Sequence, residues 1–330
     1  MAATDGSGIK LKSPSSRYRM NRFDQFIYRY NAWVIVVAAV GYNLSIEHLT
    51  DRGYSVPSLL VYRGILGGAL VGALAWRQGL SLWPQAPRMQ VVRFVNSGVA
   101  LLLAFEAFRR LAGVTVSTIQ RLDIPFAVIL GVLLGQRSRD GKLVLSLLAV
   151  GLVLSSFWFA GQIDEDPVGL GLAILAVALT AVAYLLGKQS VAAENNLTVL
   201  NTTNLGCLGV GLAVWGLGGH LSIIHAADLG LFVLSAVTQF LLNYTMAVLF
   251  RHHDVTRAQR PYLLSSVVIL GLEMVTEHKW FAPLHIGFVL VVVGVVYLIT
   301  LTDGMGALQL VRHPFRRWQR AVSEVEAVPT

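Results

Sequence analysis

The sequence predicts an all-α polytopic membrane protein with ten transmembrane helices arranged as two inverted five-helix repeats. Hydrophobic residues make up 55% of the 330 residues and charged residues only 13%. The mean hydropathy of +0.63 is typical of chains that lie largely in a bilayer. Many apolar runs are long enough to cross the hydrocarbon core, and similar segments recur at a regular offset.

The chain begins with a polar segment, residues 1–31, which we expect to be a cytoplasmic tail ending in a short interfacial helix. Phe23, Phe26, Ile27 and Tyr30 recur there at helical spacing beside basic residues. Ten apolar segments with short connections follow, so no soluble domain is expected between them. The ten expected spans cover residues 32–48, 57–77, 91–110, 113–135, 142–161, 168–188, 198–219, 228–250, 256–276 and 283–302.

The distribution of Lys and Arg orients these spans, because cytoplasmic connections carry the excess of positive charge. Nineteen of the 26 basic residues lie in the tails, including the basic C-terminal tail 303–330, and in the connections on the same side. Four lie on the opposite side, which also carries the acidic loop 164–166, and three lie within spans. We therefore expect both termini in the cytoplasm and a bacterial inner membrane as the location. The basic residues then contact membrane lipids, and no nucleic acid is expected as a partner.

Two halves of the chain, residues 32–161 and 162–302, look like copies of each other. VTVSTIQR at 114–121 returns as VTRAQR at 255–260, and Tyr42 corresponds to Tyr184. Likewise, AVILGVLLGQR returns as SVVILGLEMVTEH, and the offset stays near 139–142 residues. Five spans in each copy force the copies into opposite orientations, which is the plan of many secondary transporters. Within the second span, Gly64, Gly68 and Gly72 form a stripe that predicts close helix packing.

Several of these segments are similar to those of a known family. They are Pro57 followed by Arg63, the run FEAFRRLAGVTVSTIQRLDIPFAVILGVLLGQRSRDGKLVLSLLAVGLVLSS at 105–156, and its counterpart at 244–299. On these residues the chain, over roughly 32–302, resembles the drug/metabolite transporter superfamily in its ten-span EamA-like form. That resemblance implies alternating access through a central cavity, with the fifth and tenth spans more peripheral.

The resemblance has departures that concern the subfamily. The usual Gly-Glu dipeptide reads Gly135-Gln136 here, and the second copy has Glu277 without the glycine. The second half of each copy also resembles nucleotide-sugar and sugar-phosphate transporters. Those families place basic residues in the helices where Arg121 and Arg260 lie, but their lysine-containing motifs are absent from this sequence.

Charged and aromatic side chains inside the expected spans are the candidate substrate ligands, because a bare charge in hydrocarbon is costly. Arg121 and Arg260 suggest an anionic group on the substrate. Glu106 can face Arg121 at similar depth, or pair with Arg109 or Arg110 one turn away on its own helix. The other candidates are Asp123, Tyr42, Tyr184, Asn243 and Tyr244.

The sequence carries no sign of an enzyme. It has no phosphate loop of the form GxxxxGK[ST], no dinucleotide fingerprint and no nucleophile motif. The single Cys207 and the eight histidines show no metal-ligand spacing, so no cofactor or metal is expected.

We therefore expect a secondary active transporter, monomeric or homodimeric, that moves a small polar, anionic metabolite with a proton or counter-substrate. The alternatives are a nucleotide-sugar or sugar-phosphate antiporter and a lipid-linked sugar flippase. A non-transporting membrane scaffold or sensor is the alternative of a different class.

Overall fold

The computed structural model describes residues 22–134, 140–158, 166–276 and 283–301, and it contains only helices, turns and loops within these ranges. The tails 1–21 and 302–330, and most of the acidic loop, lie outside the described residues. The helices are α1 (Arg22–Arg29), α2 (Asn31–Asp51), α3 (Val56–Gln78), α4 (Pro87–Phe108), α5 (Gly113–Gln120), α6 (Asp123–Leu133), α7 (Asp140–Trp158), α9 (Pro167–Ala193), α10 (Asn196–Gly216), η2 (Ala226–Asp228), α11 (Leu229–His252), α12 (Val255–Ala258), α13 (Arg260–Thr276) and α14 (Pro283–Leu301).

Seven helical segments of the described chain are long and apolar enough to cross a membrane. They comprise α2, α3, α4, the combined α5 and α6, α9, α10, and η2 with α11. Two shorter apolar helices, Gly141–Ser155 and Ile286–Leu301, fall in α7 and α14. The 17-residue α13 is also shorter than the roughly 20 residues that a bilayer requires. The predicted class, an all-helical polytopic membrane protein, is confirmed.

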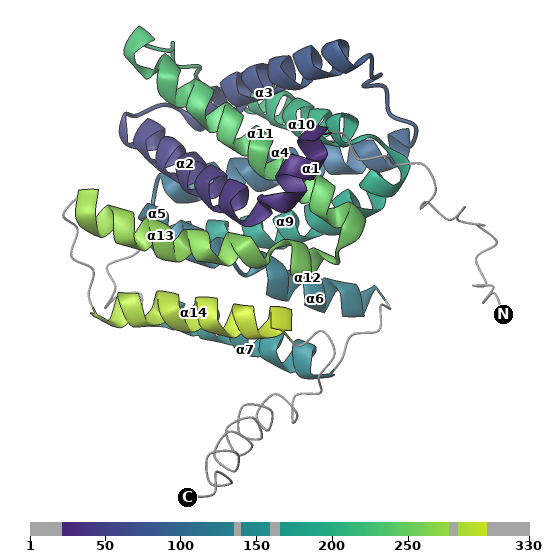
Figure 1. The fold of residues 1–330 in the computed structure, drawn as a ribbon. Helices are drawn as coiled ribbons and strands as arrows, with labels where there is room; N and C mark the ends of the chain where they lie inside the picture. The colour runs from purple at the N-terminus through teal and green to yellow at the C-terminus, as the bar shows by residue number, and fades with distance from the viewer. Residues whose placement is uncertain (1–21, 135–139, 159–165, 277–282, 302–330) are drawn as a thin grey trace, which may run out of the picture.

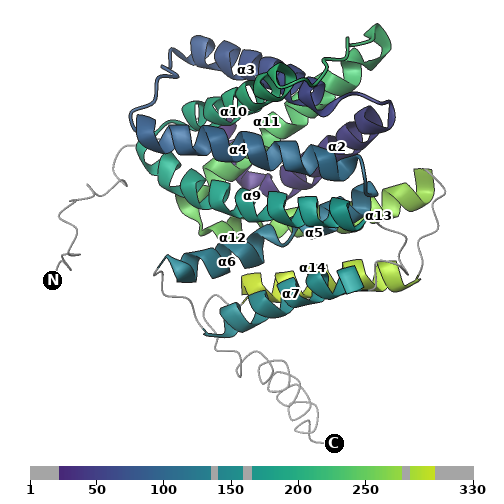
Figure 2. The ribbon, with the colours of Figure 1, turned by 180° about the vertical axis from the view of Figure 1, so that it is seen from behind.

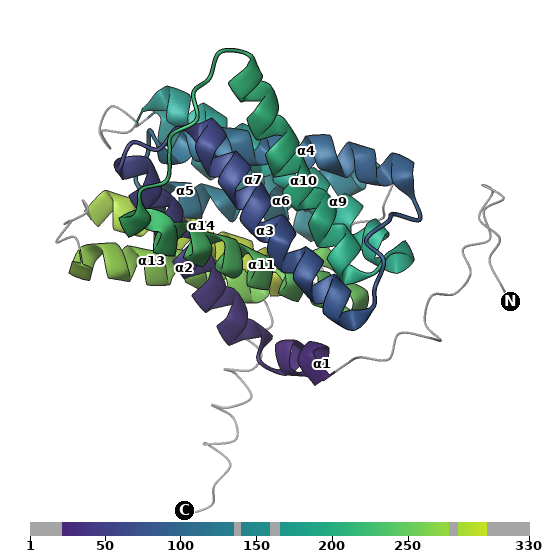
Figure 3. The same ribbon diagram turned by 90° about the horizontal axis from the view of Figure 1, so that it is seen from above.

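The helices form a bundle whose two edges are each made by a pair of helices from different halves of the chain. Figures 1 and 2 show α3 beside α10 at one edge, and α7 beside α14 at the other. Between these edges, α4 packs on α9, and α2 packs on α11. Figure 3, seen from above, shows α3 and α10 side by side across the middle of the bundle. The halves of the chain are therefore interleaved.

Two of the predicted spans are broken, each at a Gln-Arg pair. The predicted span 113–135 divides into α5 and α6 around Arg121 and Leu122, just before Pro125. Pro125 has no N–H that could donate to the carbonyl of Arg121, four residues earlier, so the helix is interrupted before the proline. The proline itself fits the first turn of the new helix, α6. The predicted span 256–276 divides at Gln259, just before Arg260 and Pro261, for the same reason.

Glycines allow α10 to approach two neighbouring helices. Gly64 and Gly67 of α3 face α10, where an added Cβ would lie 2.7–2.8 Å from atoms of Leu208 or Asn204. The predicted stripe of Gly64, Gly68 and Gly72 was therefore wrong at its last two positions, which have no atom within 4 Å of an added Cβ. Helix α4 lies even closer to α10 than α3 does, because a Cβ on Gly98 of α4 would lie 2.4 Å from the carbonyl oxygen of Gly206 of α10.

We expect Gly98→Ala to destabilise the protein by about 1–3 kcal/mol, because the new methyl group forces α4 away from α10. The matched control is Gly68→Ala on α3, where the methyl group enters open space. The control should be neutral or stabilising by up to about 1 kcal/mol, since Ala favours the helix over Gly. Thermal unfolding of the purified variants in detergent measures both, and equal melting temperatures would contradict this account of the packing.

The first turn of α9 is held by a cap and an ion pair. Asp166 is the N-cap residue and accepts a hydrogen bond from the backbone N–H of Val168 at 2.9 Å. Arg110, in the turn after α4, donates another at 2.9 Å. These two hydrogen bonds, that from Arg110 first, hold the pKa of Asp166 below its ordinary value.

The stabilisation from Asp166 should depend on pH. A carboxyl with a lowered pKa in the folded state stabilises the fold above its unfolded pKa of about 3.9, and this contribution is lost as the pH falls through the folded pKa. Asp166→Asn keeps a capping side chain but removes the ion pair. The melting temperature of wild type should exceed that of this variant at pH 7, and the difference should shrink below about pH 4. The exposed Asp51→Asn serves as control, and a pH-independent difference would contradict the assignment.

Candidate functional site

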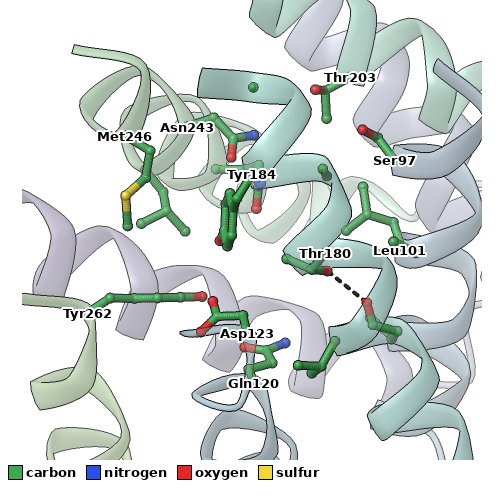
Figure 4. A pocket seen from close by; sticks show the side chains of 18 of the residues that line it. Ser97, Leu101, Gln120, Asp123, Thr180, Tyr184, Thr203, Asn243, Met246 and Tyr262 are labelled. Atoms are coloured by element: carbon green, nitrogen blue, oxygen red, sulfur yellow. Dashed lines mark hydrogen bonds between the residues drawn. The ribbon is translucent and has the colours of Figure 1, made fainter. Parts of the chain in front are cut away.

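The described bundle encloses a cavity of about 130 Å³ between the two halves of the chain. Helices α2, α4, α5 and α6 line it from the first half, and α9, α10, α11 and α13 from the second (Figure 4). At one end it reaches Val191 and Val199, where α9 ends and α10 begins. At the other end it stops at Tyr42 and Ala173. Beyond that end the bundle is filled by buried apolar side chains such as Phe105 and Phe232.

The cavity exists because two helices present small side chains to each other. The lining residues of α4 follow at intervals of three or four, which places them on one helical face: Arg93, Ser97, Ala100, Leu101 and Ala104. The lining face of α9 has the same spacing and is also rich in small residues: Ala173, Ala176, Val177, Thr180, Ala183, Tyr184, Gly187 and Val191. Alanine and glycine leave room where larger side chains would fill the space between α4 and α9.

Arg93 is the cationic group of the cavity. Its side chain is 6% exposed and donates a hydrogen bond from Nη2 to the hydroxyl of Thr203 at 3.3 Å. Its Nε and Nη1 atoms are buried and have no hydrogen-bond partner among the described residues. A buried guanidinium without a carboxylate partner is costly, and a bound anion would supply the missing acceptors. This is the strongest polar binding feature of the cavity.

Asp123 is the anionic group of the cavity and lies at the break between α5 and α6. It is 2% exposed, and its Oδ1 atom has no hydrogen-bond partner among the described residues. Figure 4 shows the hydroxyl ends of Tyr184 and Tyr262 directed towards it, with Gln120 beside it. These side chains come from both halves of the chain, so a ligand near Asp123 contacts both.

Four of the eight predicted site residues line the cavity, namely Tyr42, Asp123, Tyr184 and Asn243. They come from four different helices: α2, α6, α9 and α11. Tyr42 and Tyr184, which are predicted to correspond in the two halves of the chain, both line the cavity. Whether these residues bind a substrate stays a prediction, but the structure brings them to one place.

Arg121 lies directly behind the cavity and is fully buried. Its Nε donates to the carbonyl of Ser117 at 2.9 Å, and its Nη1 donates to the carbonyl of Tyr262 at 3.1 Å. Its Nη2 donates to the side chain of Gln120 at 3.4 Å, and the guanidinium carbon lies 3.4 Å from the centre of the Tyr262 ring. The side chain therefore joins the two broken helices, and Arg93, not Arg121, offers unused donors to a ligand.

Glu106 and Arg260 lie away from the cavity. The structure corrects the predicted pairing of Glu106 with Arg121, because Glu106 instead pairs with Arg109 at 3.3 Å on the same helix end. Both partners are partly exposed there, as the local alternative requires. Arg260 donates a hydrogen bond to the carbonyl of Thr300, which joins α13 to α14.

Tyr244, the last of the predicted residues, faces α1 instead of the cavity. Its hydroxyl donates a hydrogen bond to Asp24 at 2.7 Å, and its ring packs against Phe23 with centroids 5.3 Å apart. Asp24 is 1% exposed, so this contact fixes α1 against α11. Phe26 on α1 and Tyr30 directly after it are exposed, as an interfacial helix would require.

Sequence reasoning missed several polar lining residues: Arg93, Ser97, Gln120, Thr180, Thr203, Gln239 and Tyr262. The prediction assigns Arg93 to a cytoplasmic connection because it lies only two residues inside the predicted third span, 91–110. In the structure α4 begins at Pro87, so Arg93 lies nearly two turns inside the helix. Proline favours the first turn of a helix, and this signal at Pro87 would have placed Arg93 correctly.

The chemistry available in the cavity is binding. The described residues include no group of three or more His, Cys, Asp or Glu side chains that could hold a metal ion. The lining offers one guanidinium, one carboxylate, amides and hydroxyls in an otherwise apolar surface. Such a surface orients a small polar ligand through a few specific contacts.

No family model matches the chain, and no curated protein matches it. Among solved structures, one described only as "Crystal structure of protein" superposes with a TM-score of 0.61 at 14% sequence identity. The match covers 83% of this chain and 99% of that one. This likeness shows the fold alone, since one fold can carry many functions. The chain is thus a helical membrane protein with a polar cavity inside its bundle.

We expect Arg93→Ala to weaken the binding of small anions, because it removes the free donors of the cavity. The loss of hydrogen bonds to a charged group, about 1.5–3 kcal/mol, corresponds to a roughly tenfold to hundredfold higher Kd. Thermal stabilisation of the purified protein by inorganic phosphate and by small mono- and dicarboxylates gives the Kd values. Arg88→Ala, on the exposed side of α4, is the matched control and should bind like wild type. Equal Kd values for all three proteins would exclude Arg93 as the anion ligand.

Proposed function

We propose that the protein is a secondary active transporter that carries a small polar metabolite with an anionic group across the membrane by alternating access. The observation that carries the proposal is the buried guanidinium of Arg93 with two unpartnered donor atoms in an intramembrane cavity. Ionisable groups within membrane-spanning segments usually mark a substrate or ion path.

The charges around the cavity support an anionic ligand. The lining itself has one guanidinium, Arg93, and one carboxylate, Asp123. Two further buried arginines, Arg63 and Arg121, lie close behind the lining. These two arginines add positive charge next to the cavity. A carboxylate or phosphate on the substrate would balance this charge, and Asp123 is the candidate carrier of a coupled proton.

Alternating access is supported by the way in which the helices pair. In the proposed repeat, α2 corresponds to α9, α3 to α10, α4 to α11, α5–α6 to α12–α13 and α7 to α14. Exchanging the two halves therefore converts the contact of α4 with α9 into that of α11 with α2, and the structure contains both contacts. The same exchange relates the contact of α6 with α9 to that of α13 with α2. The pairs α3 with α10 and α7 with α14 are converted into themselves. We therefore propose ten spans in two inverted five-helix repeats, with α5–α6 and α12–α13 as corresponding broken helices.

The orientation follows from the excess of basic residues on the side of the termini. With both termini in the cytoplasm, the cavity extends towards the cytoplasmic ends of α9, α10 and α11, and it is closed towards the outside. This geometry corresponds to a conformation that receives substrate from the cytoplasm. A bacterial inner membrane is the proposed location.

The size of the cavity favours a small metabolite over the other substrate classes. Sites for drug-sized ligands occupy about 300–1,000 Å³, whereas this cavity has about 130 Å³. A nucleotide-sugar antiporter or a lipid-linked sugar flippase would need more space than this conformation offers. A scaffold or sensor would not require unpartnered charges inside its bundle.

Counterflow in proteoliposomes tests the proposal. The purified protein is reconstituted, and exchange of labelled compounds is measured for small carboxylates, sugar phosphates, nucleotide sugars, lipid-linked sugars, amino acids and neutral amines. We expect saturable exchange of a small anion, lost in Arg93→Ala and retained in Arg88→Ala. Exchange of neutral or cationic compounds alone would overturn the anionic substrate, and exchange of none would favour the scaffold or sensor.

The same preparation addresses the coupling to protons. Asp123→Asn should retain counterflow but lose accumulation driven by a pH gradient, if Asp123 carries the proton. Accumulation that persists in this variant would assign the coupling to a counter-substrate instead.

A further inference from the structure

A second buried arginine lies beyond the closed end of the cavity. Arg63 of α3 is 1% exposed, and its Nη1 donates a hydrogen bond to the hydroxyl of Tyr42 at 3.0 Å. Its guanidinium carbon lies 5.1 Å from the centre of the Tyr42 ring and 5.6 Å from that of Phe105. Its Nε and Nη2 atoms are buried without a hydrogen-bond partner among the described residues. Arg63 therefore has unused donors, as Arg93 does.

Arg63 and Arg93 lie in opposite halves of the bundle. Arg93 follows the first residue of α4 by six positions, or about 9 Å at 1.5 Å per residue. Arg63 follows the first residue of α3 by seven positions, or about 10 Å. Helices α3 and α4 are consecutive and run in opposite directions, so these two depths are measured from opposite ends of the bundle. Arg63 therefore lies near one end of the bundle and Arg93 near the other.

Tyr42 separates the two arginines. Its side chain lines the cavity, as that of Arg93 does, and its hydroxyl accepts the hydrogen bond from Arg63, which is not a lining residue. A ligand in the cavity thus reaches Tyr42 first, and it reaches Arg63 only when Tyr42 moves. The residue after Tyr42, Asn43, is also buried, and both polar atoms of its side chain lack a partner among the described residues.

We propose that Arg63 is a second binding residue for the anionic group of the substrate, engaged after Arg93 as the closed end of the bundle opens. This inference rests on the proposed transport function and adds to it a second binding position for the substrate, here called the second station. The carboxylate or phosphate leaves the donors of Arg93, passes Tyr42 and accepts hydrogen bonds from Nε and Nη2 of Arg63. The apolar packing beyond Tyr42 offers few other groups that could compensate an anion on this path.

A purely structural Arg63 predicts a different behaviour. If the guanidinium served only to hold α2, α3 and α4 together through its aromatic contacts, its loss would lower stability and leave the translocation rate of the folded protein unchanged. A second station instead predicts a defect in translocation with normal binding from the open end. The two roles are therefore separated by measuring Kd and counterflow on the same variants.

The test compares Arg63→Gln with wild type, using the small anion that wild type binds most tightly in the thermal panel. We expect the Kd of Arg63→Gln in detergent to stay within about threefold of wild type, whereas its counterflow rate should fall by roughly tenfold or more, as expected for lost hydrogen bonds to a charged group. Arg93→Gln should raise the Kd instead. The matched control Arg77→Gln, at the exposed end of α3, should change neither quantity.

Each other outcome decides against the second station. Wild-type counterflow in folded Arg63→Gln would leave Arg63 structural, and an equal loss of affinity and rate would place it in a single site with Arg93. If Arg63→Gln cannot be purified, Arg63→Lys, which keeps the charge but has fewer donors, carries the same comparison. Failure of wild type to exchange any anion would remove the proposed function itself, which distinguishes that failure from a failure of Arg63 alone.

Discussion

The contact between Arg121 and Tyr262 is the interaction on which the arrangement of the cavity depends. Pro125 and Pro261 break two helices, and a break inside a membrane leaves backbone carbonyls that need donors. The guanidinium of Arg121 donates to carbonyls on both sides of the crossing and stacks on the Tyr262 ring. A second link, from the hydroxyl of Ser266 to the carbonyl of Ser117 at 2.9 Å, lies beside it. The two broken helices are thereby held together across the halves of the chain.

This crossing sets the positions of the groups that line the cavity. Because α6 begins at Asp123, two residues after Arg121, the Asp123 side chain lies in the space between α4, α9 and α11. Tyr262 enters the same space from the start of α13. The buried arginine thus has a structural role that allows the neighbouring carboxylate to stay unpaired.

The close packing of small residues has a second consequence. Glycines allow α10 to contact α3 and α4 almost backbone to backbone, whereas the alanines of α4 and α9 leave the space that forms the cavity. The first arrangement makes a firm edge of the bundle, and the second leaves a cavity beside it. Small residues therefore have opposite effects at the two places. At the glycines a neighbouring backbone fills the space and the helices pack tightly, whereas at the alanines no backbone fills it and a cavity remains.

The sequence by itself determined the class of protein and the positions of most helices, because hydrophobic length and proline placement are local properties of the chain. It also selected Tyr42, Asp123, Tyr184 and Asn243, since polar groups in apolar spans are conspicuous. Only the tertiary structure decided that Arg93 and Arg63, and not Arg121, have donors without a partner among the described residues. Hydrogen-bond partners such as Tyr262 for Arg121, or Thr300 for Arg260, lie far away along the chain. For the same reason, no local pattern could show that Arg93 faces the cavity while Glu106 and Tyr244 do not.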